Sequence, residues 1–239
     1  KLYDKDTEYI DARHIDVSEI ENFNEIFEGY KNVKSINLTG WDVSKGLTFD
    51  SMFLECGNLE NIIGIDDFVF NDDRNNKVEL SFMFFTCKSL KNIDISEWDI
   101  SNVKFLNGLF WGCHSLETPG DLSNWNTSNV ISMSFMFNQC YKLQTIGDVS
   151  NWKFNNLSRI DRAFHDCREL KSLGDISKWN VSNVENMDSM FSYNKSFNQP
   201  IGDWDISKVI NMHSMFYYAK SFNQPIGDWD VSKVINMNG

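Results

Sequence analysis

The sequence has no uninterrupted apolar run of about 18 residues, so we expect no membrane-spanning helix within it. It has no basic face either. Its 34 Asp and Glu residues against 22 Lys and Arg give a formal net charge of −12, which argues against a nucleic acid partner. Gly-rich phosphate loops and the motifs of zinc proteases and serine hydrolases are also missing. The chain lacks a secretory signal, but it starts at Lys1 and stops within a repeat, so we expect it to be a segment of a longer protein.

The dominant feature that is present is a repeat running through the whole chain. The stretch SFNQPIGDWDISKVINM at residues 196–212 returns at 221–237 with one change, Ile206 to Val231. With the Trp of this stretch as anchor, units follow one another after 25 to 30 residues, and the longest spacing holds a polar insertion near 71–76, predicted to be a surface loop. The anchors of eight units and the start of a ninth are Ile15, Trp41, Phe68, Trp98, Trp125, Trp152, Trp179, Trp204 and Trp229.

Each unit predicts one short helix and one short strand. Three residues after the anchor stands a residue of helix-capping type, and apolar residues follow at helical spacing, as in Val184, Met187, Met190 and Phe191. The alternating run LKNIDIS at 90–96 predicts a strand. Neither element can bury its apolar side alone, so we predict an α/β repeat solenoid over residues 1–239, with one strand and one helix per 25–27-residue unit. The predicted caps are Ser18, Ser44, Asn71, Ser101, Ser128, Asn155, Ser182, Ser207 and Ser232.

Two more rows keep the same register and are expected to join the Trp anchors in the interior. One is a Phe row: Phe27, Phe53, Phe84, Phe110, Phe137, Phe164, Phe191 and Phe216. The other contains all five cysteines, three residues later: Cys56, Cys87, Cys113, Cys140 and Cys167. No C-x2-C pair exists for zinc, and an odd count spread over separate units argues against a disulfide framework. We interpret the cysteines as small buried residues; the alternative is that neighbouring thiols lie close enough to oxidise.

The pattern L-x-x-I-x-I-S-x-W-D-x-S-x-V-x-x-M-x-x-M-F-x-x-C-x-x-L resembles leucine-rich repeats of the BspA-like kind. It is most similar to the bacterial surface-protein repeat of roughly 26 residues, the DUF285 type, with which it shares WDVSKVINM, SMF and SFNQPIGDWD. The resemblance starts at about Ile15 and weakens at Gly46 and after Phe70. It implies a leucine-rich-repeat solenoid at a cell surface or secreted, with roles in adhesion and binding. Similar repeats also occur in intracellular and viral proteins.

An acidic row stands four residues before the anchor: Asp94, Asp121, Asp148 and Asp175. Alternation with buried neighbours predicts that these side chains line the outer, concave face of a sheet. Stacked like charges repel one another, so the row needs a reason to exist. Three explanations stay open: Ca²⁺ binding, a basic patch on a protein partner, or hydrogen bonds to local N–H groups in the Gly-Asp turns.

Three further sets of polar or aromatic residues are candidates for an exposed surface. Ser96, Ser123, Ser150 and Ser177 follow the acidic row and extend it or close turns. The last two units replace the acidic row by Pro200 and Pro225 and present Asn198, Gln199, Asn223 and Gln224. Trp111, Tyr193, Tyr217 and Tyr218 lie outside the Trp and Phe rows, so we expect them to be exposed.

The four histidines, His14, His114, His165 and His213, occupy different phases of the repeat and predict no catalytic ladder. We therefore predict no enzyme, no cofactor and a binding or adhesion module that presents a partly acidic sheet face to a protein at a cell surface. The alternative is a structural spacer of a larger surface or virion protein. An enzyme or metal-binding module is the third hypothesis.

Overall fold

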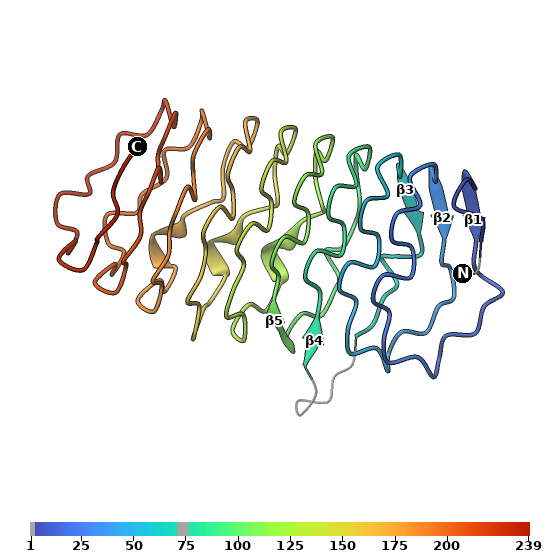
Figure 1. Cartoon of the computed structure of the whole chain (residues 1–239). Coiled ribbons are helices and arrows are strands. Elements are labelled where there is room, and N and C mark those ends of the chain that lie inside the picture. Colours follow the sequence, from blue (N-terminus) through green and yellow to red (C-terminus); the bar gives the residue numbers. More distant parts are fainter. Residues whose placement is uncertain (1–2, 71–76) are drawn as a thin grey trace.

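The protein is a stack of coils that follow one another along one axis (Figure 1). The computed structural model describes residues 3–70 and 77–239, so the predicted insertion lies outside the described residues. We number the coils by their anchors, from coil one at Ile15 to coil eight at Trp204, with coil nine beginning at Trp229. The prediction of a repeat, solenoid-like fold is confirmed, but its local structure differs from the one predicted.

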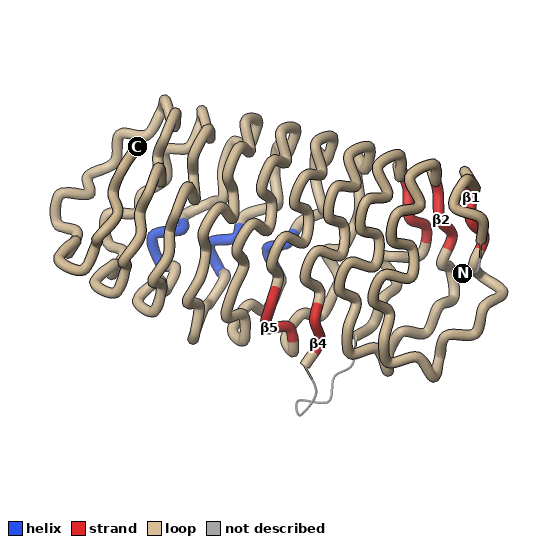
Figure 2. The backbone as a smooth tube through the Cα atoms, viewed as in Figure 1, coloured by secondary structure: helices blue, strands red, loops and turns tan. Residues whose placement is uncertain are grey.

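Regular strands are short in the described residues. The strands β1 (Tyr9–Asp11), β2 (Ser35–Asn37) and β3 (Asn61–Ile63) form a parallel sheet in coils one to three, shortly before each anchor. Strand β4 (Val78–Glu79) pairs in parallel with β5 (Val103–Phe105), and these two lie after the anchor, on another side of the coil (Figure 2).

The prediction of one strand in every unit is wrong. In coils five to seven its place is taken by single turns of 3-10 helix: η1 (Leu122–Asn124), η2 (Val149–Asn151) and η3 (Ile176–Lys178). In coil four, the stretch 90–96 contributes one isolated bridge, between Asn92 and Thr118. Each 3-10 turn begins after an Asp whose side chain accepts a hydrogen bond from the N–H two residues on, and this local bond bends the backbone away from an extended strand.

The coils are joined by a parallel ladder of β-bridges on the side where a helix was predicted. Its rungs lie seven residues after most anchors, and successive rungs pair from coil to coil through the described residues. The rungs are Asn22, Thr48, Glu79, Phe105, Ser132, Arg159, Asn186, Asn211 and Asn236.

The residues from each rung onward form a ribbon of turns rather than a helix. In coil two the N–H groups of Ser51 and Phe53 donate to carbonyls of coil three at 3.0 and 2.8 Å, whereas those of Met52 and Leu54 donate to carbonyls three residues back. Ser51 and Glu55 both have a φ of 58°, which lies in the left-handed region. We call this segment the turn ribbon; it spans 22–30, 48–56, 79–87, 105–113, 132–140, 159–167, 186–194 and 211–219.

The helix prediction was wrong because the turn ribbon buries the same spacing as a helix. Phe49, Met52, Phe53 and Cys56 are all fully buried, at positions i, i+3, i+4 and i+7. Alternate N–H groups of the ribbon bond to the next coil instead of to the carbonyl four residues back. The apolar pattern therefore identified the buried face correctly, but not the backbone that presents it.

The Ser residues predicted as helix caps are donors instead. The N–H of Ser44 donates to Oδ1 of Asp42 at 3.0 Å, and that of Ser101 to Oδ1 of Asp99 at 2.9 Å. The Asp or Asn that follows the anchor thus closes an Asx turn. The same bond is made by Ser18, Ser128, Ser182, Ser207 and Ser232. Of the other two predicted caps, Asn71 lies outside the described residues, and Asn155 follows Lys153, which offers no acceptor.

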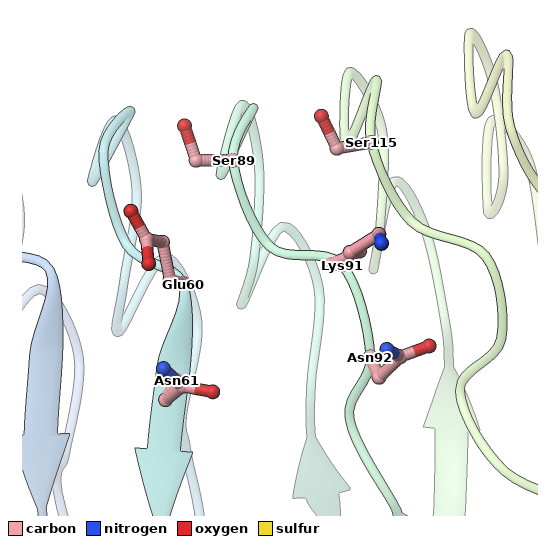
Figure 3. Close-up of a pocket in the computed structure, with 6 residues that line it drawn as sticks. All are labelled: Glu60, Asn61, Ser89, Lys91, Asn92 and Ser115. Atoms are coloured by element: carbon pink, nitrogen blue, oxygen red, sulfur yellow. The ribbon is translucent and has the colours of Figure 1, made fainter.

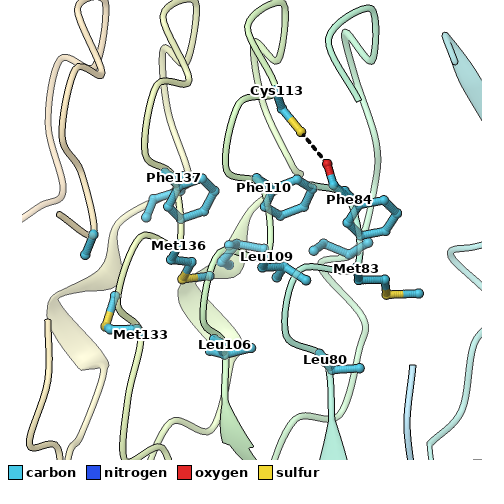
Figure 4. Close-up of a cluster of buried hydrophobic side chains, with 14 of the residues drawn as sticks. Leu80, Met83, Phe84, Leu106, Leu109, Phe110, Cys113, Met133, Met136 and Phe137 are labelled. Atoms are coloured by element: carbon cyan, nitrogen blue, oxygen red, sulfur yellow. Dashed lines mark hydrogen bonds between the residues drawn. The ribbon is translucent and has the colours of Figure 1, made fainter. Parts of the chain in front are cut away.

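Aromatic ladders fill the interior of the stack (Figure 4). Consecutive rings of Phe84, Phe110, Phe137 and Phe164 are nearly parallel, with centroids 5.0, 5.5 and 5.9 Å apart. The anchors Trp41, Trp98, Trp125, Trp152, Trp179 and Trp204 are buried, while Trp229 and Phe216, near the last coil, are half-buried. Each Trp anchor also donates its indole N–H to a carbonyl of the preceding coil, as Trp152 does to Leu122 O at 2.9 Å.

The cysteine position supplies the same kind of bond between coils. The thiol of Cys113 lies 3.0 Å from the carbonyl oxygen of Phe84 in the preceding coil (Figure 4), and all five thiols are buried, free and placed alike. In coil seven Asn194 occupies this position and donates its amide to Phe164 O at 2.8 Å. The position therefore favours a small donor directed at the preceding coil.

Candidate functional site

The acidic row lies at turns rather than on a sheet face, which corrects the predicted placement. Asp121, Asp148 and Asp175 directly precede η1, η2 and η3, and Asp94 holds the equivalent position in coil four. Each side chain is exposed, and its Oδ1 accepts the N–H of the Ser two residues on at 3.0 to 3.1 Å. The partners are Ser96, Ser123, Ser150 and Ser177, which are half-buried.

A glycine of the next coil packs against three of these carboxylates, those of Asp94, Asp121 and Asp148. Gly147 has a φ of +86°, and a Cβ added there would lie 1.9 Å from Oδ1 of Asp121. The Gly-Asp pair therefore combines a backbone conformation suited to glycine with a close approach between coils.

Local hydrogen bonds favour the ionised form of two members of the row, Asp148 and Asp175. The Ser150 hydroxyl and N–H hold the pKa of Asp148 below its ordinary value, and Asp175 in the next coil acts in the opposite direction more weakly. The Ser177 hydroxyl and N–H likewise lower the pKa of Asp175. The carboxylates of Asp148 and Asp175 are thus charged at neutral pH.

A second set of carboxylates shares this geometry but was missed in the sequence. The Asp side chains just after the anchors accept the N–H of the Ser that we had interpreted as a cap. The sequence did contain the signal for these turns, because the acidic row and this second set both occur in the motif D-x-S. The members used below are Asp16, Asp42, Asp99 and Asp205, all exposed.

The amides of the last coils bond mainly to one another. The side-chain amide of Gln224 donates to Asn198 O at 2.9 Å, and the N–H of Asn223 donates to Oδ1 of Asn198 at 2.8 Å. Gln199 donates to the hydroxyl of Ser172 at 3.1 Å. These residues therefore tie neighbouring coils together.

A polar depression lies near β3, but it has no buried reactive group. Glu60, Asn61, Ser89, Lys91, Asn92 and Ser115 line it (Figure 3). The Lys91 ammonium lies 3.2 Å from a carboxylate oxygen of Glu117. Over residues 3–70 and 77–239 no three His, Cys, Asp or Glu side chains are arranged to hold a metal ion, and no helix is long and apolar enough to cross a bilayer.

One arrangement on the turn ribbon has the order of groups found in serine hydrolases. The Ser214 hydroxyl lies 3.5 Å from Nε2 of His213, whose Nδ1 lies 2.9 Å from Oδ1 of Asp188. However, Asp188 is also ion-paired with Arg162 at 2.9 Å, and the N–H groups of Ser214 and Met215 already donate to backbone carbonyls. These two N–H groups are therefore not free to stabilise an oxyanion, and the arrangement is a set of polar contacts around Asp188.

Asp50, on the turn ribbon of coil two, yields a testable pH dependence. Burial, and then the nearby Glu79, raise its pKa to about 6, against a smaller opposing effect of the Ser81 N–H, and its Oδ1 has no hydrogen-bond partner. The folded state therefore holds this proton more tightly than the unfolded state, whose Asp titrates near 4. Stability contributed by the bound proton is lost as the pH rises from about 4 to about 6.

Asp50→Asn should therefore stabilise the protein above pH 6 by about 1 kcal/mol, a figure reduced for the partial exposure of the side chain. The advantage should vanish below pH 4, where wild type is protonated in both states. Urea unfolding at pH 4 and pH 7.5 measures it. The control Asp42→Asn keeps its Asx turn, because Asn180 makes one at the same position, and should change little. An equal gain at both pH values would contradict the assignment.

Comparisons with known proteins find one family model and several similar solved structures. The sequence model of the family described as "Mycoplasma protein of unknown function, DUF285" matches residues 3–77, 78–174 and 148–239. A search among curated proteins finds no match. Among solved structures, the chain is similar to the T. pallidum Leucine Rich Repeat protein, with 17% identity over 81% of this chain and 69% of that one and a TM-score of 0.35. It is also similar to a leucine rich cell surface protein from Faecalibacterium prausnitzii A2-165, with 14% identity over 95% and 84% and a TM-score of 0.31.

Proposed function

Since this chain belongs to the DUF285 family, we propose that it is a non-catalytic module that binds a protein partner, with the acidic row as a contact surface, at a cell surface or secreted. The observation that supports the proposal is the regular set of exposed carboxylates held in one orientation by Asx turns. Such a row complements Lys and Arg side chains on a partner, and its repeated spacing lets many weak contacts add together. Ca²⁺ is a weaker candidate for the same row, because one carboxylate per coil gives few oxygen ligands.

The test removes charge without removing the turns. Asp94, Asp121, Asp148 and Asp175 are changed together to Asn, which closes the same turn at Asn126 and Asn180. We expect the melting temperature to persist, while binding of a synthetic oligolysine peptide, measured by titration at low salt, falls at least about tenfold. The matched control changes Asp16, Asp42, Asp99 and Asp205 to Asn and alters the net charge by the same amount.

Equal losses in both variants would show a general effect of net charge and would contradict a specific contact surface. A second candidate function is a structural spacer, which the local hydrogen bond to one oxygen of each carboxylate favours. A spacer predicts that neither variant changes any specific binding. Addition of Ca²⁺ should leave the melting temperature unchanged on either interpretation.

A further inference from the structure

The outward positions of the turn ribbon differ between coils, whereas its inward positions repeat. In coils three to five the outward side chains include four half-buried aromatic residues, Phe82, Phe85, Trp111 and Phe135, which we call the aromatic patch. Elsewhere on the ribbon the equivalent positions hold other residue types, of which Gly108, Asn138, Ser189 and Ser192 are buried. They are Glu25, Glu28, Ser51, Leu54, Gly108, Asn138, Arg162, His165, Ser189, Ser192, Ser214 and Tyr217. The fold therefore does not require aromatic residues at these positions.

The rings of the aromatic patch contact one another along the axis of the stack. Trp111 stacks on Phe135 with centroids 4.8 Å apart and an interplanar angle of 19°. Phe85 makes a T-shaped contact with Trp111, with centroids 4.9 Å apart and an angle of 76°. The Arg162 guanidinium lies 5.5 Å from the Phe135 centroid. Trp111 and Phe135 thus each have one face covered by the other, and the Arg162 guanidinium lies over the Phe135 ring.

The backbone makes room for this patch at one position. Gly108 has a φ of +58°, and a Cβ there would lie 2.5 Å from the Phe82 ring. Positive φ alone does not call for glycine here, because Ser51, Ser189 and Ser214 hold the same position with φ between 51° and 58°. The glycine is therefore needed for the Phe82 ring.

Charged groups of opposite sign flank the patch. On the coil six side, Arg159, Arg162 and Arg168 have side chains 56%, 43% and 48% exposed, while the carboxylates that they contact, Asp161, Asp188 and Asp166, are only 4%, 13% and 9% exposed. The guanidinium groups thus form the surface and the carboxylates lie beneath them. On the side of coils two and three lie the half-buried Asp50 and Glu79, which are near enough for Glu79 to raise the pKa of Asp50.

We infer that the aromatic patch is the centre of a protein-docking surface whose partner presents apolar side chains flanked by acidic residues toward coil six and basic residues toward coils two and three. Aromatic residues and Arg dominate binding energy when they lie at the centre of an interface. The inference rests on the proposed protein-binding function, but it assigns the main contact to the turn ribbon instead of the acidic row. The orientation of the partner along the stack follows from the two flanking charges.

The experiment selects binders without assuming their sequence. A display library of random 12-residue peptides is panned on the whole wild-type chain, and the consensus peptide is synthesised and titrated. We expect an apolar or aromatic centre with Asp or Glu on one side and Lys or Arg on the other. Trp111→Ala should weaken its binding about 30-fold or more, as loss of an interface hot spot does. Tyr9→Ala, which removes an aromatic side chain 67% exposed on β1, should leave it unchanged.

A second variant separates docking from folding. Gly108→Ser retains every aromatic side chain and a backbone that Ser tolerates in other coils, yet it displaces the Phe82 ring, so we expect several-fold weaker binding at an unchanged melting temperature. Circular dichroism melts of each variant verify the fold. A consensus peptide bound equally by wild type, Trp111→Ala and Gly108→Ser overturns the inference, as does a library that yields no patch-dependent binder.

Two further arms distinguish the alternatives. If the Asn variant of the acidic row loses the peptide while Trp111→Ala retains it, the proposed function stands and this inference fails. If both variants retain every selected binder, both fail. Binding to a glycan array that is lost in Trp111→Ala would make the partner a saccharide and would overturn the protein assignment.

Discussion

Phe137→Ala should lower the free energy of unfolding by about 3–5 kcal/mol, the range measured for truncating fully buried Phe side chains. Phe137 is completely buried and lies between Phe110 and Phe164, with centroid distances of 5.5 and 5.9 Å. The removed ring leaves a cavity that two neighbouring coils would have to fill together. Because the turn ribbons of these coils are hydrogen-bonded to one another through alternate N–H groups, their collapse onto the cavity is restricted.

The matched control is Phe216→Ala in coil eight. Phe216 occupies the same position in the repeat but is half-buried, so its loss should cost clearly less. Guanidinium unfolding followed by Trp fluorescence measures the loss of stability in both variants. The slope of the transition shows whether the stack still unfolds as one unit. Equal costs for the two substitutions would contradict a continuous Phe ladder as the main support of the core.

The rows of buried residues could be predicted from the sequence because they depend only on register. A Trp, Phe or Cys that recurs at a fixed position must meet its equivalent in the next coil once the units stack, whatever backbone carries it. The repeat length, the stacking and the interior place of Trp152, Phe137 and Cys140 follow from this. They do not depend on the local hydrogen-bonding pattern, which is where the prediction failed.

The backbone could not be predicted because two different structures bury positions i, i+3, i+4 and i+7. Met133, Met136, Phe137 and Cys140 have this spacing, and a helix was the more familiar reading. The turn ribbon competes successfully because half of its N–H groups bond to the adjacent coil, a partner that no single unit reveals. Positive φ at residues such as Phe135 and Gln139 runs against their intrinsic preference, so local propensity gives no indication of it.

The candidate surfaces were predicted unevenly for a related reason. The acidic row is visible in the sequence because it repeats, and its local hydrogen bonds were among the explanations considered. The aromatic patch does not repeat: Phe82, Phe85, Trp111 and Phe135 come from two different positions in three coils. The cluster was not predicted because the segment was interpreted as a helix, and the outward positions of a turn ribbon differ from those of a helix. Trp111 was the single member expected to be exposed.

All five thiols should resist alkylation in the folded protein. The ratio of alkylation rates between the unfolded and the folded chain is the largest effect on a rate that the structure predicts. Burial raises the pKa of Cys56 from about 9 to about 12, and burial likewise raises the pKa of Cys87, Cys113, Cys140 and Cys167. Near pH 8, a rise of three pKa units alone reduces the reactive thiolate about 1,000-fold. Each thiol is also directed at a carbonyl of the preceding coil rather than at solvent, as Cys140 is at Phe110 O.

Iodoacetamide labelling followed by intact mass measurement tests this, with denatured protein as the reference for complete labelling. Asn194→Cys should add a sixth protected thiol, because Asn194 already donates to Phe164 O from the cysteine position. Tyr218→Cys should add a reactive one, since Tyr218 is 55% exposed. The same raised pKa values predict that stability declines as the pH rises above about 9, where unfolded thiols release protons that the folded chain retains. The contrary result is rapid labelling of the native wild-type thiols at pH 8, at a rate like that of the cysteine in Tyr218→Cys. It would show that the coils open locally and that hydrogen bonds from the cysteine position do not hold neighbouring coils together.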